Sequence, residues 1–135
     1  MIFFADTWFW IALLNPNDDY HKQATIFLKT MQPTSYIVTV DEVLVELLTY
    51  FASRGFSARQ QATQFVEELF DSSVEVVPQT RDSLCKGIEL YKKRPDKKYS
   101  LTDCISMQTM KAMDIHEVLT HDHHFTQEGF KRLLN

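Results

Sequence analysis

The sequence predicts an α/β domain in which helices cover a mostly parallel sheet of four or five strands. Short apolar segments alternate with longer segments whose apolar residues recur at helical spacing. This alternation is typical of a parallel sheet with helices on both faces, a three-layer α/β/α sandwich. The 135 residues contain no repeat, low-complexity tract or internal linker, so we expect one domain over residues 1–135.

The N-terminal elements are predicted from short apolar runs and from the turn and capping residues that separate them. Ile2–Ala5 is apolar and short, which predicts a buried strand. Thr7 can cap a helix that continues through Leu14 and ends at an Asn- and Asp-rich turn. A second helix is predicted between a cap at Asp19 and Pro33. Tyr36–Val40 is β-branched and short, and predicts the second strand.

The middle of the chain predicts two helices and a strand. One helix covers about Asp41–Ser53 and is closed by Gly55. Ser57–Gln60 has the spacing of a capping box and predicts a helix that continues to about Phe70. Val74–Val77 is the third predicted strand.

The C-terminal part repeats the alternation. Thr80 or Asp82 opens a helix that Pro95 stops, and a capping box at Ser100–Asp103 opens another that continues through Met113. The fourth strand is predicted at Glu117–Thr120. We expect a short helix or turn over Phe125–Leu134, with a small edge strand as an option.

Composition limits the class of protein. Hydrophobic residues make up 44% and charged residues 24%, which is ordinary for a globular domain. No run of about 18 apolar residues predicts a membrane span. The start has no basic region and reaches an acid, Asp6, too early for a signal peptide, so we expect a cytoplasmic protein. Cys85 and Cys104 are interpreted as reduced core residues.

The charge of the chain is unevenly distributed. The net charge of −4 argues against a generic nucleic-acid binder, because phosphate contacts need basic residues. However, residues 91–99 carry a net +4, which leaves −8 for the rest. The five basic residues in this segment are Lys92, Lys93, Arg94, Lys97 and Lys98. They suit an RNA-binding segment, although cations also occur at solvated helix C-termini.

Four carboxylates occur in apolar surroundings: Asp6, Glu46, Asp103 and Asp122. An ionised carboxylate in such surroundings loses hydration unless a positive group replaces the water. Two of them follow predicted strands and two lie on predicted helices, and ligands gather at the carboxyl ends of parallel strands. The sequence therefore predicts one shared acidic pocket that binds a divalent metal.

Each acid also has an ordinary structural explanation. Asp6 suits a helix N-cap, Asp103 suits the first turn of a helix, and Asp122 suits a polar turn. Glu46 lies in mid-helix between apolar residues, where an internal salt bridge is the alternative to a metal. The metal hypothesis depends on the four acids together.

Histidine and tryptophan side chains are also candidates for a functional role. His121, His123 and His124 lack the spacing of a zinc site, so we expect solvated loop residues. Trp8 and Trp10 are expected in the core or on a partner surface rather than as stacking platforms for bases. A magnesium-dependent phosphatase is disfavoured because the chain has only 3 glycines and no phosphate-cradling motif.

Five segments resemble PIN-domain ribonucleases, and most closely the VapC-like toxins of type II toxin–antitoxin pairs. The resemblance covers about Ile2 to Leu134. The segments are Phe4-Ala-Asp6-Thr7, Asn17-Asp-Asp19-Tyr-His21-Lys-Gln-Ala24, Val43-Leu-Val-Glu46-Leu-Leu-Thr, Tyr99-Ser-Leu-Thr-Asp103-Cys and Val118-Leu-Thr120-His-Asp122-His-His-Phe125. Each fragment is weak alone, and their order makes the resemblance specific.

The resemblance implies a PIN-like fold and places the four acids on the acidic quartet of the family. Thr7 and Thr120 fall on hydroxyl positions that support the site. The implied activity is endonucleolytic cleavage of RNA by water activated with Mg²⁺ or Mn²⁺. The implied partners are a cognate antitoxin and a second copy of the chain in a homodimer. A catalytically inactive PIN fold that binds RNA or protein is the alternative.

Overall fold

Five strands form the central sheet in the computed structural model, which describes residues 1–135. The strands are β1 Ile2–Ala5, β2 Tyr36–Val40, β3 Glu75–Val77, β4 Glu117–Leu119 and β5 Lys131–Arg132. Their order across the sheet is β3-β2-β1-β4-β5, and every neighbouring pair is parallel. The parallel sheet of the sequence prediction is confirmed, with the fifth strand at one edge.

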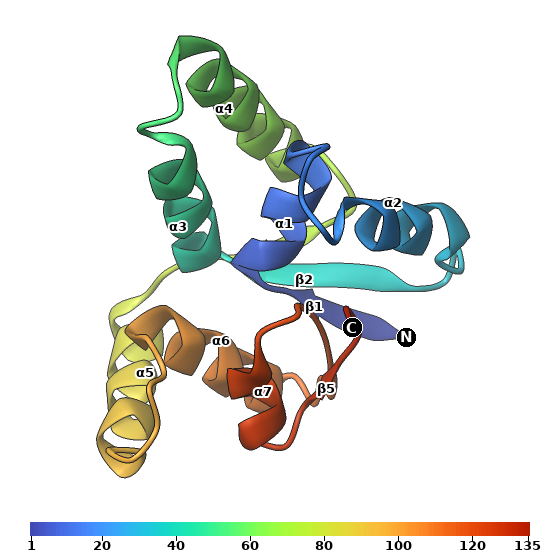
Figure 1. Ribbon diagram of the computed structural model, residues 1–135. Helices are drawn as coiled ribbons and strands as arrows, with labels where there is room; N and C mark the ends of the chain where they lie inside the picture. The colour runs from blue at the N-terminus through green and yellow to red at the C-terminus, as the bar shows by residue number, and fades with distance from the viewer.

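Seven helices complete the fold. They are α1 Thr7–Leu14, α2 His21–Thr30, α3 Asp41–Phe51, α4 Phe56–Phe70, α5 Arg81–Lys93, α6 Leu101–Ala112 and α7 His123–Gln127. In Figure 1, α1 to α4 lie on one side of the sheet and α5 to α7 on the other. The three-layer α/β/α arrangement is confirmed. None of these helices meets the length and apolarity needed to cross a bilayer.

Parallel pairing sets the position of the site. Ala5 pairs with Leu119, so the residues that follow β1 and β4 emerge side by side at the centre of the sheet. The Asp6 amide donates to the Leu119 carbonyl at 3.3 Å and extends this pairing by one residue. The chain after β2 enters α3 directly at Asp41. The carboxyl ends of the central strands thus share one edge, as expected for a parallel sheet.

The core joins the sheet to both helix layers. Twenty-nine buried apolar residues form one cluster, with Phe4, Phe9 and Trp10 among its largest members. Its continuity across the sheet stabilises the strand ends that carry the site. Between α5 and α6, Gly87 allows close contact, because a Cβ at this position would collide with the Ile105 side chain.

Some local predictions were confirmed and others were wrong. The capping box at Ser100 is present, and Thr80 caps α5. Asp19 does not cap α2, and α4 begins at Phe56 without a side-chain cap, so Ser57 forms no capping box. The observed start of each helix lies one or two residues from the start that the expected cap would give: α2 begins at His21 and α4 at Phe56. The prediction that both cysteines lie in the core was wrong for one, since Cys104 is buried but Cys85 is exposed.

Candidate metal centre

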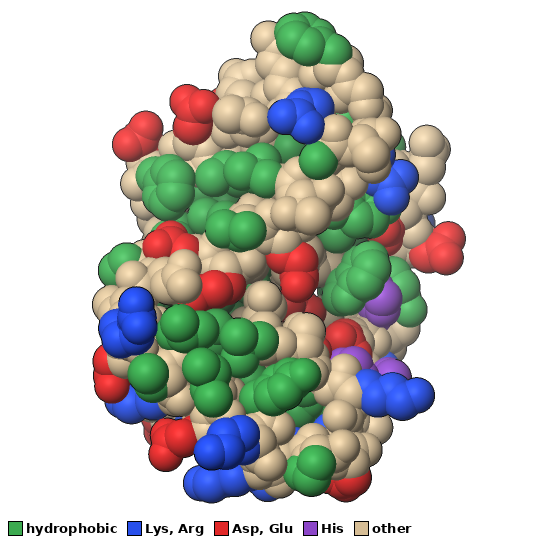
Figure 2. All heavy atoms as spheres, turned by 90° about the vertical axis from the view of Figure 1, so that its left-hand side faces the viewer, with side chains coloured by type: hydrophobic (Ala, Val, Ile, Leu, Met, Phe, Trp, Pro, Cys, Tyr) green, Lys and Arg blue, Asp and Glu red, His purple; other side chains and the backbone are tan.

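The four acids predicted from the sequence converge at the carboxyl edge of the sheet. Asp6 follows β1, Asp122 follows β4, and Glu46 and Asp103 lie on α3 and α6. Figure 2 views the molecule from the side where the strands end, and acidic side chains there lie in a depression between two groups of hydrophobic side chains. Asp6 and Asp103 are buried, while Glu46 and Asp122 are partly exposed.

Asp6 and Asp122 are joined through Thr120. The Thr120 hydroxyl donates to Asp6 Oδ2 at 2.9 Å, and its oxygen accepts the Asp122 amide at 3.1 Å. Asp6 occupies the N-cap position of α1 but makes no side-chain cap hydrogen bond. Its carboxylate is therefore turned toward β4 and the other acids, which disfavours the alternative of an ordinary helix cap.

Glu46 is oriented by Thr7, the first residue of α1. The Thr7 hydroxyl donates to Glu46 Oε1 at 2.6 Å. No basic side chain forms an ion pair with Glu46, so the internal salt bridge considered from the sequence is not formed. Both threonines expected to support the site thus contact one of the acids.

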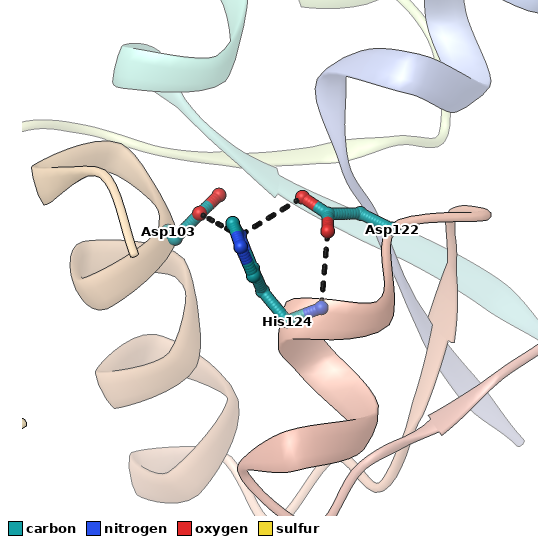
Figure 3. Close-up of side chains that lie close together, drawn as sticks. All are labelled: Asp103, Asp122 and His124. Carbon is teal, nitrogen blue, oxygen red and sulfur yellow. Dashed lines mark hydrogen bonds and ion pairs between the residues drawn. The ribbon is translucent and has the colours of Figure 1, made fainter. Parts of the chain in front are cut away.

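Asp103, Asp122 and His124 form the tightest cluster (Figure 3). His124 Nδ1 lies 3.1 Å from Asp103 Oδ2 and 3.4 Å from Asp122 Oδ2. Asp122 Oδ1 accepts the His124 amide at 3.0 Å, and Asp103 Oδ2 accepts the Ser100 amide at 3.1 Å. The capping role of Asp103 is real, and the same side chain also faces Asp122.

The acids raise one another's pKa. Burial, followed by the charge of Asp103, raises the pKa of Asp6 well above its ordinary value. Burial also raises the pKa of Glu46 and of Asp103, and repulsion from Asp122 adds to both shifts. Thr7, Thr120 and His124 lower these pKa values in part. Positive charge among these oxygens would favour the ionised acids.

The donor set fits a hard divalent cation. Mg²⁺ and Mn²⁺ prefer oxygen ligands, and Mn²⁺ also accepts an imidazole nitrogen. Ligands about 2.0–2.2 Å from an octahedral ion lie about 3 Å from their neighbours. The separations of His124 Nδ1 from the two aspartate oxygens match this spacing. The oxygen-rich set does not fit a structural zinc site.

His124 is the site residue that sequence reasoning missed. Its side chain is 20% exposed, whereas neighbouring His123 is 67% exposed and matches the expectation of a solvated loop residue. His121 lies instead against the Tyr20 ring, with centroids 4.3 Å apart. The three histidines therefore do not share one site. The sequence feature that could have indicated its role is its position, two residues after Asp122 and in the first turn of α7.

The five basic residues of segment 91–99 differ in their surroundings. Lys97, Lys98, His123 and His124 line a cavity of about 330 Å³. Lys97 and Lys98 also line an adjoining cavity of about 490 Å³, together with Lys92 and Arg94. Lys93 lines neither cavity.

Arg94 is held by a buried glutamate that the sequence did not point to. Its guanidinium donates to both oxygens of Glu128, at 2.9 and 3.0 Å. Lys111 and the Tyr99 hydroxyl also donate to this carboxylate, which is 5% exposed. Arg94 therefore anchors the basic segment to the residue that follows α7, and Lys97 and Lys98 line a cavity that His124 of the acidic cluster also lines.

A family model of the PIN domain matches residues 3–131. The chain belongs to the PIN-domain family. It is similar to the crystal structure of VapC20 from Mycobacterium tuberculosis, a toxin that cleaves the sarcin-ricin loop, with 27% identity and a TM-score of 0.86 over 98% of this chain and 99% of that one. The resemblance to PIN domains and VapC-like toxins noted from the sequence is confirmed.

More distant structures share this PIN fold. One is VapBC2 of Rickettsia felis bound to promoter DNA, at 16% identity and a TM-score of 0.68, with 98% of each chain covered. Another is FitAcB of Neisseria gonorrhoeae, at 16% identity and a TM-score of 0.66, with 98% of this chain and 96% of that chain covered. None of the curated proteins matches this chain at a significant level.

Proposed function

We propose that this PIN domain is a Mg²⁺- or Mn²⁺-dependent endoribonuclease and the toxin of a toxin–antitoxin pair. The observation that carries the proposal is the gathering of Asp6, Glu46, Asp103 and Asp122 at one edge of the sheet, where their only basic partners are the histidines His123 and His124 and no lysine or arginine pairs with them. VapC20, with 27% identity over nearly the whole chain, is described as a toxin that cleaves the sarcin-ricin loop, which supports RNA as the substrate class.

The residues divide into ligands and supports. Asp6 and Asp103, the two buried acids, would be direct ligands, and Glu46 and Asp122 would hold a second ion or coordinated waters. A divalent cation bound there would lower the pKa of a water molecule and neutralise charge on the attacked phosphodiester. Thr7 and Thr120 orient Glu46 and Asp6 through their hydroxyl groups. His124 joins the ligand set beside Asp103 and Asp122.

The substrate contacts are proposed on the basic side of the site. Lys97 and Lys98 line both cavities, one of which is also lined by His123 and His124, so they would contact the phosphates of the bound RNA. Lys92 extends this surface, Arg94 acts through its ion pair with Glu128, and Lys93 lines neither cavity.

The partners proposed are a cognate antitoxin and a second copy of the chain. Two of the similar structures are toxin–antitoxin complexes, VapBC2 and FitAB. On this chain, α3 and α5 expose Val45, Ile88 and Tyr91, which suit an apolar helix of an antitoxin laid over the acidic depression. Phe9 and Trp10 are buried, so only Trp8 of the aromatic first helix remains for any surface contact.

Incubation of the purified protein with cellular RNA and Mn²⁺ tests the activity. We expect cleavage that EDTA abolishes and that Asp103→Asn reduces by at least about 100-fold, as is typical when a group stabilising the transition state is lost. Asp82→Asn is the matched control, since Asp82 is an exposed acid that pairs only with Lys86. A protein that binds RNA but does not cleave it with any divalent metal would support the inactive binding module instead.

A further inference from the structure

Aromatic side chains lie along one side of the acidic cluster. Each lies within four residues of a candidate acid: Trp8 of Asp6, Tyr50 of Glu46 and His121 of Asp122. Tyr50 shares a face of α3 with Glu46, because residues four apart on a helix are neighbours. Trp8 is brought to the same side by its ring contacts with Tyr50 and His121. The chain therefore positions an aromatic group beside three of its four acids.

These rings contact one another. The Trp8 ring centroid lies 5.2 Å from that of His121 and 6.4 Å from that of Tyr50. His121 in turn stacks on Tyr20 at 4.3 Å with 8° between the planes. Figure 2 shows histidine and hydrophobic side chains in contact at one end of the acidic group. The Trp8 ring is thus held in position by neighbours on two sides.

Trp8 is nevertheless open to solvent. It is 37% exposed, whereas Trp10, two residues later, is 2% exposed and packs in the core. Phe9, Trp10 and Ile11 already supply the core contacts of α1, so packing of the core does not account for an exposed indole two residues after Asp6. A rigid aromatic face beside a site for phosphate chemistry is what stacking with a base requires.

We propose that Trp8, flanked by Tyr50 and His121, forms a stacking site for an unpaired base of the RNA adjacent to the cleaved phosphate. The inference rests on the proposed nuclease function, because it assumes that a phosphate lies at the acids. RNA-binding proteins stack splayed bases on aromatic rings and recognise single-stranded loops in this way. The sequence analysis placed Trp8 in the core or on a partner surface, and its exposure beside the acids points to this further role.

The geometry gives the RNA strand two distinct sides. On one side of Asp122, His123 and the two lysines of the 330 Å³ cavity face the backbone phosphates. On the other side, His121 and Trp8 face a base. Stacking tolerates every base, so this site selects an unpaired nucleotide rather than a particular sequence.

The test measures RNA binding with Ca²⁺ in place of Mg²⁺ or Mn²⁺, so that a divalent cation still offsets the charge of the acids, and uses RNA with phosphorothioate linkages to suppress cleavage. The probes are a short unstructured RNA and an oligomer of the same length whose central nucleotides are abasic. We expect the RNA to quench the tryptophan fluorescence of the wild type to saturation and the abasic oligomer not to do so. In Trp8→Leu, where buried Trp10 is the remaining tryptophan, the RNA should not quench it. Trp8→Leu should weaken RNA binding about 5- to 150-fold, the range for loss of one stacked base, and Trp8→Phe should weaken it less.

Combining the protein variant with the abasic oligomer, and adding a control variant, decides between stacking and other roles of Trp8. Trp8→Leu should leave binding of the abasic oligomer unchanged, because the stacking partner is already absent. Phe56→Leu changes an aromatic residue that is 82% exposed at the start of α4, and it should bind RNA like the wild type. Equal weakening of both oligomers by Trp8→Leu would overturn the proposal.

Two further outcomes would also overturn it. One is an unchanged RNA affinity in Trp8→Leu, and the other is a change of subunit number by light scattering without a change in RNA affinity, which would assign Trp8 to a protein interface. Cleavage of RNA by the wild type with Mn²⁺ separates the two claims. If the wild type cleaves while Trp8→Leu binds RNA normally, the stacking site is wrong and the nuclease function stands.

Discussion

Thr120 contacts two of the acids at once, through its hydroxyl to Asp6 and through its oxygen to the Asp122 amide. Thr120→Val keeps the shape of the buried side chain and removes both hydrogen bonds. We expect about 10- to 100-fold weaker Mn²⁺ binding by calorimetry, as is usual when an outer partner of a metal ligand is lost. Thr120→Ser should retain most of the affinity. Unchanged Mn²⁺ binding in the valine variant would contradict the supporting role.

Glu128 predicts an acid-sensitive contribution to stability. Burial alone would raise its pKa, but hydrogen bonds from Arg94, Lys111 and Tyr99 outweigh burial and lower the pKa from 4.5 to about 2. A lowered folded pKa means that the stabilisation is complete above the ordinary value near 4.5 and is lost as the pH falls toward about 2.

We therefore expect Glu128→Gln to lower the free energy of unfolding at pH 7 by about 1.5–3 kcal/mol, the range for hydrogen bonds to charged groups. The loss should shrink as the pH falls from 4.5 toward 2. Urea unfolding across this pH range measures both effects. The control is Glu67→Gln, an exposed change on α4 that should stay within about 0.5 kcal/mol. A pH-independent loss would show that the ion pairs are not its cause.

At the scale of single residues, the sequence predicted the four acids and the threonines Thr7 and Thr120 that contact them, but it did not predict the roles of His124 and Glu128. The four acids were recognisable because an ionised carboxylate among apolar residues is unfavourable unless a positive group compensates it. His124 and Glu128 were not, because His124 follows an equally plausible His123 and Glu128 looks like an ordinary exposed acid. Their roles depend on contacts with α6 and with the basic segment, which no local pattern contains.

At the scale of elements, the lysines in the loop between α5 and α6 should determine how RNA binding depends on salt. Lys97→Glu with Lys98→Glu should weaken RNA binding and flatten the plot of log affinity against log salt. Each lost phosphate contact lowers the slope by about 0.7 for single-stranded nucleic acid. Binding titrations at several salt concentrations measure this slope.

The matched control for this charge reversal is Lys22→Glu with Lys29→Glu. Both lysines are exposed on α2, which lies on the other side of the sheet from α5 and α6 (Figure 1). The control changes the net charge equally, so its slope should remain near that of the wild type. Equal slopes for the two double variants would assign the basic segment to a solvated helix end.

Elements were predictable where a local pattern decides them. β2 was predicted with its observed bounds, and the Ser100 capping box opened α6 as expected, since both depend on adjacent residues. The start of α4 was displaced to Phe56, because Gly55 at φ 100° turns the chain into the helix without a side-chain cap. The order of the strands followed from no single segment and needed the parallel pairing of β1 with both β2 and β4.

At the scale of the whole molecule, the repulsion among the acids couples metal binding to stability. On the proposed function Mg²⁺ would bind only the folded state, so 100 times its Kd should add about 2.7 kcal/mol to the free energy of unfolding and raise Tm by several degrees. Asp103→Asn should lose this increase, while the exposed-acid control Asp82→Asn should keep it. Thermal unfolding with and without Mg²⁺ measures the difference. The same Tm increase in Asp103→Asn would remove Asp103 from the ligands.

The central claim is that this PIN domain gathers four carboxylates to hydrolyse RNA with water and a divalent cation. Analysis of the end groups of the cleaved RNA tests it most directly. We expect a 5′-phosphate and a 3′-hydroxyl, because water attacks the phosphodiester. A 2′,3′-cyclic phosphate would show that the neighbouring ribose hydroxyl attacks instead, and would contradict it.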